Sequence, residues 1–294
     1  MTTKVSLAIL GFGRLGACLA IAARQAGYPI AAVTAAGEAT REAAVRDGFS
    51  VRKSNVEAAA LGDVIILCVP DRQIEPVCRE LVEGGRLRTG QVLLHTSGAN
   101  AASLLTLAKT GGVSIGALHP LQSFTDTTKA AQQFLNIFFA VDGEQAAVAA
   151  ASELAQALGG QVLYVPPQER ALYHAAAVTA SNYLVSLLSV SERLFSRWTP
   201  NGHALDAVLP LAEGTLRNIR RQGTSAALTG PIARGDIETV TKHLRALPPD
   251  LIPLYKTLGL AALAMTPSNL STVQQLALRQ LLQTPINKEE LPYE

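Results

Sequence analysis

Two polar residues of the C-terminal half have the types and spacing needed to act on a small carbonyl compound. His174 lies near the start of an apolar helical stretch, and Asn182 follows two turns later, about 80° further around the helix. Histidine suits proton transfer because its unperturbed pKa of about 6.5 lies near working pH. We expect His174 to donate a proton and Asn182 to hold the substrate oxygen. The alternative is a core histidine whose nitrogens are satisfied by the backbone.

Two further candidates follow predicted strands. Ser97 belongs to His95-Thr96-Ser97-Gly98, and His119 opens His119-Pro120-Leu121-Gln122-Ser123-Phe124. The carboxyl ends of parallel strands meet at one edge of a sheet, so both residues are expected to line a pocket there. A His-Pro pair at a strand end can also simply shape a turn.

A polar loop at residues 229–236 supplies the candidate substrate anchors. Arg234 could grip a substrate carboxylate with its planar guanidinium, and Thr229 opens the same loop. Asp236 is a natural N-cap for the helix that follows. No histidine or cysteine spacing is typical of a metal site, so no metal is expected.

The N-terminal glycine pattern predicts a dinucleotide site. A G-x-G-x-x-G follows an apolar strand directly and opens a helix; it comprises Gly11, Phe12, Gly13, Arg14, Leu15 and Gly16. The first glycine permits the tight turn, the second leaves room for a diphosphate, and the third allows close helix packing. The helix N-terminus offers free N–H donors to the phosphates. The alternative is a glycine-rich turn without a ligand.

The end of the second predicted strand favours NADP(H) over NAD. An NAD site usually places an acidic residue there, whereas this chain has Thr34 followed by Ala-Ala-Gly. Arg41 lies shortly beyond and could meet a 2′-phosphate, although it could equally be a solvated helix charge. Val69 and Pro70 end another strand at the same edge and are expected to flank the cofactor.

The elements that would position these residues form two halves. Strands and helices alternate up to Val165, which predicts an α/β, doubly wound Rossmann domain over residues 1–165. After Pro166-Pro167 the pattern becomes helical, with one long helix expected over residues 168–198. Residues 166–294 are therefore expected to form an all-α substrate and dimerisation domain.

Composition narrows the partners. Lys and Arg total 25 against 23 Asp and Glu, a net charge of +2, and aromatic residues make up 5%. This balance does not support a nucleic-acid binder, which needs clustered positive charge and stacking surfaces. The chain shows no pattern of a signal peptide or membrane span, and its three cysteines form no disulfide framework. A cytoplasmic protein that works on small molecules, without nucleic acid or membrane, is expected.

Taken together, the motifs resemble a known family. The glycine motif, the Ser97 and His119 loops, the helix of residues 174–182 and the loop of residues 229–236 occur together in Rossmann-like oxidoreductases whose C-terminal domain was long labelled as of unknown function. These are similar to the 6-phosphogluconate dehydrogenase-like superfamily, and their branch includes alternative ketopantoate reductases. The resemblance implies NADPH as reductant and a 2-oxo acid or related carbonyl as substrate. Ordinary ketopantoate reductases place a lysine where this sequence has His174.

The sequence therefore predicts an NADP(H)-dependent oxidoreductase that reduces a small carbonyl compound, such as the 2-oxo acid 2-dehydropantoate. Two alternatives remain. One is a reductase of a cyclic imine, which carries its own proton and needs His174 less. The other is a non-catalytic NADP(H)-sensing protein. The apolar residues of the long helix also predict a homodimer.

Overall fold

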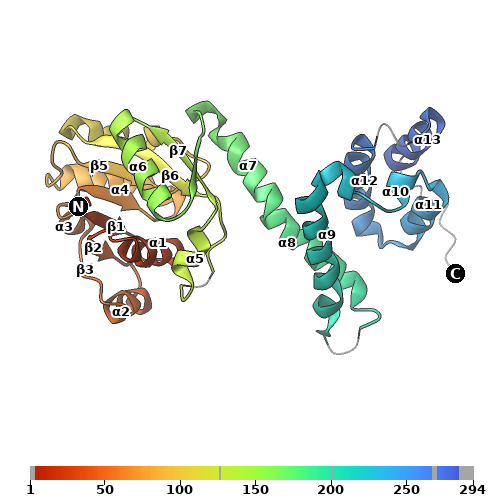
Figure 1. Ribbon diagram of the computed structural model, residues 1–294, viewed down its shortest axis with the longest axis horizontal. Helices are drawn as coiled ribbons and strands as arrows, with labels where there is room; N and C mark the ends of the chain where they lie inside the picture. Colours follow the sequence, from red (N-terminus) through yellow and green to blue (C-terminus); the bar gives the residue numbers. More distant parts are fainter. Residues whose placement is uncertain (1–3, 126, 200–201, 267–269, 285–294) are drawn as a thin grey trace. The chain divides into compact units, whose positions relative to one another are not determined.

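An eight-stranded sheet organises the N-terminal part of the computed structural model, which describes residues 4–125, 127–199, 202–266 and 270–284. Its strand order is β3-β2-β1-β4-β5-β6-β7-β8 (Figure 1). The strands, in chain order, are β1 (Leu7–Leu10), β2 (Ile30–Thr34), β3 (Val51–Arg52), β4 (Val64–Leu67), β5 (Val92–His95), β6 (Ser114–Pro120), β7 (Phe138–Gly143) and β8 (Gln161–Tyr164). The predicted doubly wound Rossmann fold is confirmed.

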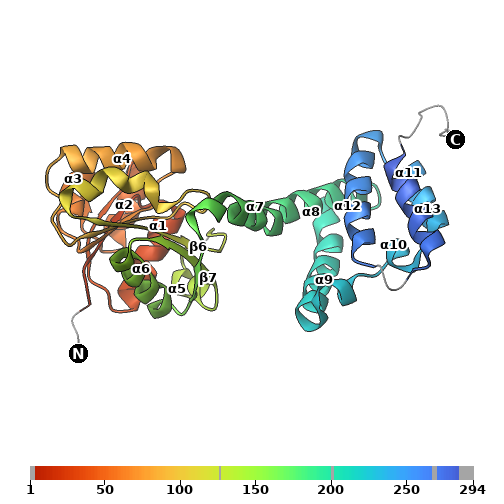
Figure 2. The same cartoon turned by 90° about the horizontal axis from the view of Figure 1, so that it is seen from above.

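Helices cover both faces of this sheet because its strands are apolar on both sides. Leu7 and Ile9 of β1 pack into one core, and Ala8 and Leu10 pack into the other. Figure 2 shows α4 and α6 on opposite sides of the sheet. The covering helices are α1 (Arg14–Gln25), α2 (Glu38–Arg46), α3 (Asn55–Ala59), α4 (Asp71–Glu83), the 3₁₀ helix η1 (Ala102–Gly111), α5 (Ala130–Phe134) and α6 (Gln145–Ala157).

Several details differ from the sequence expectations. Strand β7 runs antiparallel to β6, because no crossover returns the chain to the other end of the sheet before β7 begins. The segment Ala102–Gly111 between β5 and β6 is a 3₁₀ helix, and strand β3 has only two residues.

The chain divides into two compact units, residues 1–186 and 187–294. The sequence places its boundary earlier, near Pro166. The difference arises because the start of α7 (Arg170–Ala180) is tied to the sheet by a buried ion pair between Arg170 and Asp142. The predicted single helix of residues 168–198 is also interrupted. It begins as the 3₁₀ turn η2 (Pro167–Glu169) and breaks at Ser181 before α8 (Asn182–Phe195).

The second unit is helical, as predicted. Val240, Leu244, Leu263 and Leu278 belong to its core, which α11, α12 and α13 share. Beyond α8, the helices are α9 (Ala204–Ala227), α10 (Pro231–Arg234), α11 (Ile237–Ala246), the 3₁₀ turn η4 (Pro249–Leu251), α12 (Ile252–Ala264) and α13 (Thr272–Gln283). Within the described residues, no helix combines the length and apolar character that crossing a bilayer requires.

Candidate functional site

The glycine turn between β1 and α1 has the geometry of a dinucleotide cradle. A Cβ atom on Gly16 would lie 1.9 Å from the Gly11 carbonyl oxygen, so helix and turn pack too closely for any side chain. A Cβ on Gly13, in contrast, would meet no atom within 4 Å. Helix α1 has neither a side-chain N-cap nor an acidic residue in its first turn. Its first N–H groups therefore have no capping side chain as a partner, which is typical of a helix start that binds phosphate.

Thr34 at the end of β2 fixes this turn. Its carbonyl oxygen accepts hydrogen bonds from the Gly11 and Phe12 N–H groups at 3.1 and 2.7 Å. Its hydroxyl accepts from the Gly11 N–H and donates to the Asn55 side-chain oxygen. The Phe12 side chain packs against Phe49 in the core, so only its backbone is free to approach a ligand. Thr34 and Phe12 thus shape the cradle.

The other predicted cofactor residues border the same region. Arg14 and Leu15 form the first turn of α1, and Val69 and Pro70 follow β4. Arg41 is exposed on α2, and its guanidinium lies 3.5 Å from the Ala35 carbonyl oxygen. This position places a cation beside the loop that follows β2, where an acidic residue would stand in an NAD site.

Ser97 belongs to a hydrogen-bond network that the sequence did not reveal. Its hydroxyl donates to the Asp71 carboxylate at 2.8 Å, and the Asn100 amide donates to the same oxygen at 2.9 Å. The Asn100 N–H in turn donates to the Ser97 oxygen. Asp71 begins α4, so the network joins the loops after β4 and β5. In the sequence, this network was indicated only by the expected position of both loops at one edge of the sheet.

His95 shapes the loop that carries Ser97. The ring is fully buried; Nδ1 accepts from the Ser97 N–H at 3.2 Å, and Nε2 lies 3.0 Å from the Ala101 carbonyl oxygen. Burial lowers the pKa of His95, outweighing its bond to the Ala101 carbonyl. Both nitrogens are thus committed to the backbone, and His95 has a structural role.

A cavity of about 600 Å³ brings together three of the four predicted catalytic residues, His119, His174 and Asn182. His119 comes from the end of β6, while the other two lie on either side of the break at Ser181. The His119 and His174 rings meet edge to face, with centroids 6.3 Å apart. Ser97 is not part of the lining, but the neighbouring Gly98 lies against both rings: a Cβ there would be 2.8 Å from atoms of each.

Other lining residues set the polarity of this cavity. Among the described residues around it there is no Asp, Glu, Lys or Arg, and the wall combines small apolar side chains with hydroxyl and amide groups. These are Leu121, Gln122, Ser123, Leu163, Tyr173, Ala176, Ala177, Val178, Ala180 and Ser181. These hydroxyl, amide and imidazole groups suit the binding of a carbonyl oxygen by hydrogen bonds.

The electrostatic surroundings keep the His119 ring uncharged. Burial is the largest cause, followed by the nearby positive charge of Arg170 and by His174, and together they lower the pKa of His119 to about 4. Asp71 acts in the opposite direction. At neutral pH, His119 is therefore a neutral imidazole.

Tyr173 and Arg170 were missed by the sequence interpretation. The Tyr173 hydroxyl lies 2.8 Å from His119 Nδ1, and Arg170 holds the start of α7 against Asp142. The sequence contained one indication of this ion pair. Asp142 follows an apolar run that predicts a buried strand, and a buried carboxylate requires a partner. The spacing of residues along the chain could not identify Arg170 as the partner of Asp142.

The second unit holds the predicted substrate residues. Thr229 and Arg234 lie beside and on α10, and Asp236 caps α11 by accepting from the Thr239 N–H, as predicted. Their predicted contact with a carboxylate stays a prediction. Among the described residues, no group of three or more His, Cys, Asp or Glu side chains is placed to hold a metal ion.

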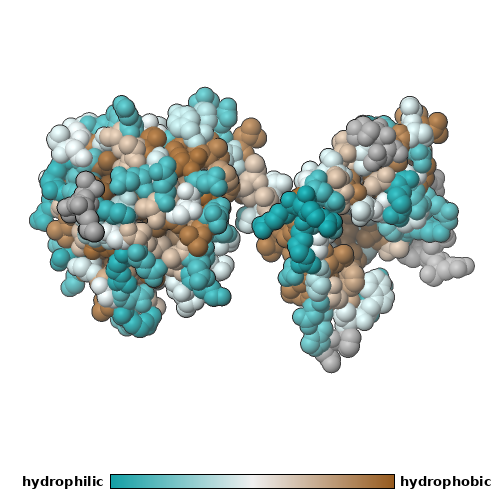
Figure 3. Space-filling model, in the orientation of Figure 1, coloured by the Kyte–Doolittle hydropathy of each residue, from teal (hydrophilic) through white to brown (hydrophobic). Residues whose placement is uncertain are grey.

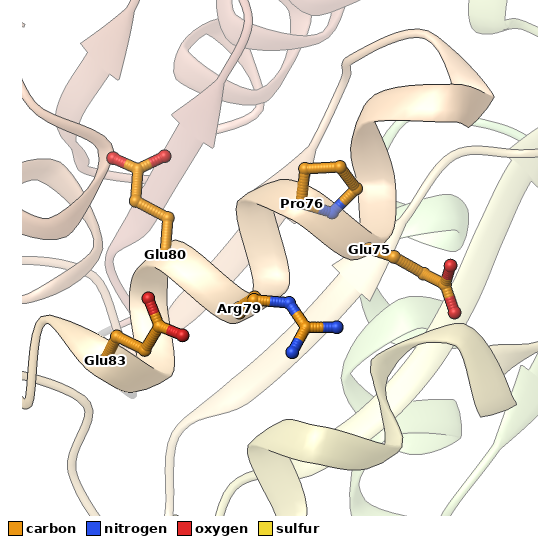
Figure 4. Close-up of a pocket in the computed structure, with 5 residues that line it drawn as sticks. All are labelled: Glu75, Pro76, Arg79, Glu80 and Glu83. Atoms are coloured by element: carbon orange, nitrogen blue, oxygen red, sulfur yellow. The ribbon is translucent and has the colours of Figure 1, made fainter.

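A second hollow lies on the outer face of α4. Figure 4 shows its lining along one side of the helix: Glu75, Pro76, Arg79, Glu80 and Glu83. Glu80 already accepts a hydrogen bond from Asn55. None of the predicted site residues lines this hollow, which has the character of a solvated helix face.

The fold and the glycine cradle define a Rossmann-type protein with a helical C-terminal domain. Residues 1–120 match the family described as a Rossmann-like domain, and residues 137–262 match a domain of unknown function, DUF2520. The chain therefore joins these two domains in one polypeptide. This confirms the resemblance inferred from the sequence to Rossmann-like proteins with such a C-terminal domain.

Known proteins share parts of this architecture. A structure from Bacteroides fragilis, provisionally assigned as an NADP oxidoreductase, superposes with a TM-score of 0.74 at 23% identity, covering 89% of this chain and 99% of that one. A 1-pyrroline-5-carboxylate reductase from Streptococcus pyogenes gives 0.62 at 15% identity, covering 90% and 100%. These likenesses establish the fold.

One curated relative has a higher identity over a shorter stretch. The NADP(+) ketol-acid reductoisomerase of Pyrobaculum calidifontis is 35% identical over 95 residues, which is 32% of this chain. The match spans only 28% of that enzyme's own length.

Proposed function

We propose that this protein is an NADP(H)-dependent oxidoreductase that reduces a small carbonyl compound. The observation that carries the proposal is the cavity lined by His119, His174 and Asn182, in the unit that also bears the glycine cradle. The Bacteroides protein is described as an NADP oxidoreductase and the Pyrobaculum enzyme as an NADP(+) reductoisomerase, which supports the choice of cofactor.

The chain has residues suited to hold this cofactor. The uncapped start of α1 and the open face of Gly13 would receive the diphosphate, and Arg41 would meet the 2′-phosphate. Val69 and Pro70 would border the nicotinamide side. When bound, NADPH supplies a hydride to the carbonyl carbon.

The residues of the cavity would then handle the oxygen. His174 gives a proton to the developing alkoxide, and solvent restores it; Asn182 orients the oxygen by hydrogen bonding. A 2-oxo acid such as 2-dehydropantoate is the proposed substrate, with Arg234 and Thr229 as candidate carboxylate ligands. We also propose a homodimer, supported by exposed apolar side chains such as Leu172, Tyr183 and Val185. Figure 3 shows apolar residues at the surface of both units, and light scattering tests the dimer.

A cyclic imine is the second candidate substrate. The fold shared with 1-pyrroline-5-carboxylate reductase favours it. An imine is already protonated at neutral pH and therefore needs no proton from His174.

A panel of 2-oxo acids and cyclic imines, assayed side by side for NADPH oxidation, tests the proposal. For a 2-oxo acid, His174→Ala should lower kcat by about 10²- to 10⁴-fold, the usual contribution of a proton donor. Affinity for NADPH should be unchanged, because His174 is not among the residues proposed to hold the cofactor. For an imine, the variant should retain most of its activity. Tight NADPH binding without turnover of any compound would favour the sensor alternative.

A further inference from the structure

Tyr173 and His119 form a hydrogen-bonded pair on the wall of the cavity. The Tyr173 oxygen lies 2.8 Å from His119 Nδ1, and the two rings stand edge to face at 87°. Tyr173 projects from α7, one turn after the anchored Arg170, and His119 is the penultimate residue of β6. The pair therefore joins the sheet to the helix that carries His174.

The direction of this hydrogen bond follows from the partners available. Among the contacts of the described residues, His119 Nδ1 is the one hydrogen-bond partner of the Tyr173 hydroxyl. A phenol has a single hydrogen to donate, and a neutral imidazole has one nitrogen that accepts and one that donates. If the Tyr173 hydroxyl uses its hydrogen in this bond, it donates to His119 Nδ1. Nδ1 is then the accepting nitrogen, and the imidazole proton is on Nε2.

The Nε2 edge of the His119 ring lies beside Gly98, a residue without a side chain. A Cβ on Gly98 would lie 2.8 Å from His119 Nε2 and 2.8 Å from His174 Cδ2. Glycine at this position keeps that side of both rings clear. The structure gives Nε2 no hydrogen-bond partner among the described residues, while the ring lines the cavity.

We propose that Tyr173 holds His119 in the Nε2–H tautomer, so that His119 presents a neutral N–H donor to the substrate oxygen. The use of that donor rests on the proposed function; the tautomer itself does not. Here His119 donates only a hydrogen bond, and the transferred proton still comes from His174. A neutral imidazole can stabilise a developing oxyanion in this way without being consumed.

The groups around the ring agree with a neutral donor. From α7, Arg170 and His174 oppose a positive charge on His119, and Tyr173 adds none; Asp71 at the start of α4 favours it, and buried His95 on β5 opposes it weakly. Burial is the largest influence, and the resulting pKa is about 4. A second proton on the ring is therefore excluded at neutral pH.

Nuclear magnetic resonance of the whole chain labelled with ¹⁵N-histidine tests the tautomer without substrate. Long-range proton–nitrogen correlations at pH 7.5 should show His119 protonated on Nε2 and bare on Nδ1, with His119→Gln supplying the assignment. In Tyr173→Phe, a population protonated on Nδ1 should emerge. A wild-type ring protonated on Nδ1, or on both nitrogens, would overturn the inference, as would a Tyr173→Phe spectrum identical to wild type.

The chain supplies a matched control in its second unit. His243 Nδ1 and the Tyr255 hydroxyl are also 2.8 Å apart, with rings edge to face at 89°. Tyr255→Phe should alter the His243 signals and leave those of His119 unchanged.

Kinetics then separate the inference from the proposed function. Tyr173→Phe should lower kcat about 10-fold or more for a carbonyl that the wild type reduces, without changing NADPH affinity, whereas Tyr255→Phe should not. Equal kcat in Tyr173→Phe and wild type overturns the inference and leaves the proposed function standing. A wild type that reduces no carbonyl defeats the proposed function and leaves the tautomer assignment standing.

Discussion

Asp142 of β7 forms a buried ion pair with Arg170 at the start of α7, and it also binds the first residue of η1. One oxygen accepts from Arg170 Nε at 2.5 Å, and the other accepts from the Ala102 N–H at 2.8 Å. Both side chains are at most 1% exposed. Tyr173 and His174 follow Arg170 by about one helical turn. The ion pair therefore fixes the position of both residues relative to the sheet.

Breaking this ion pair should destabilise the first unit strongly. Arg170→Met leaves the Asp142 carboxylate buried without its partner, which typically costs about 3–5 kcal/mol of unfolding free energy. Arg88→Ala removes the exposed pair with Asp63 in the same unit and should cost about 1 kcal/mol or less. Urea titrations followed by circular dichroism measure both values. Equal losses in the two variants would contradict the anchoring role.

Two glycines of the cradle should respond differently to the same added methyl group. In Gly16→Ala the methyl would collide with the Gly11 backbone oxygen, so the variant should lose about 1–3 kcal/mol of stability. In Gly13→Ala the methyl meets no protein atom, so stability should stay near that of the wild type. The methyl would instead occupy the approach of the diphosphate. NADPH affinity should then fall about 10-fold or more, equivalent to about 1.4 kcal/mol.

Thermal melts and NADPH titrations on the same samples separate these two effects. A Gly13→Ala variant that binds NADPH as tightly as the wild type would place the cofactor elsewhere.

Arg41 should set the preference between the two nicotinamide nucleotides. A hydrogen bond to a charged group is worth about 1.5–3 kcal/mol, so Arg41→Ala should weaken NADPH binding about 10-fold or more. NADH, which lacks the 2′-phosphate, should bind the variant and the wild type alike. Arg46→Ala, which removes a cation further along α2, is the control. Parallel titrations with both nucleotides provide the comparison, and an unchanged preference in Arg41→Ala would exclude the 2′-phosphate contact.

The buried histidines should make the protein less stable in mild acid. The folded-state pKa of His119 is lowered to about 4, mainly by burial, and the pKa of His95 is lowered for the same reason. Below pH about 6.5 the unfolded chain binds more protons than the folded one. The contribution of the two neutral histidines to the free energy of unfolding is therefore fully present above that pH. It is lost as the pH falls toward 4.

Melting temperatures between pH 7.5 and 4.5 test this dependence. The decline should be shallower in His119→Gln than in the wild type, whereas Arg88→Ala should keep the wild-type slope. Identical slopes in all three proteins would show that His119 does not titrate differently on folding.

The sequence by itself determined the features that depend on local pattern. Glycine spacing after an apolar strand predicted the turn of residues 11–16. The helix starts so close to the strand end that a side chain at Gly16 would collide with the Gly11 backbone, so glycine is required there. Alternating strands and helices predicted the sheet and its edge. Since the ends of parallel strands share that edge, the position of His119 beside it followed from the strand pattern alone. The sequence placed His174 and Asn182 on one continuous helix. The break at Ser181 separates them into α7 and α8, and both line the cavity all the same.

Only the tertiary structure decided which side chains pair across long stretches of chain. Arg170 forms an ion pair with Asp142, 28 residues earlier in the chain, and the Ser97 hydroxyl donates a hydrogen bond to Asp71, 26 residues earlier. The Phe12 ring turns into the core, although its motif suggested contact with the cofactor. Such outcomes depend on strand order, on the antiparallel turn of β7 and on which buried charges need partners. Periodicity along the chain records which face of an element is apolar, but it does not record which distant residue packs against that face.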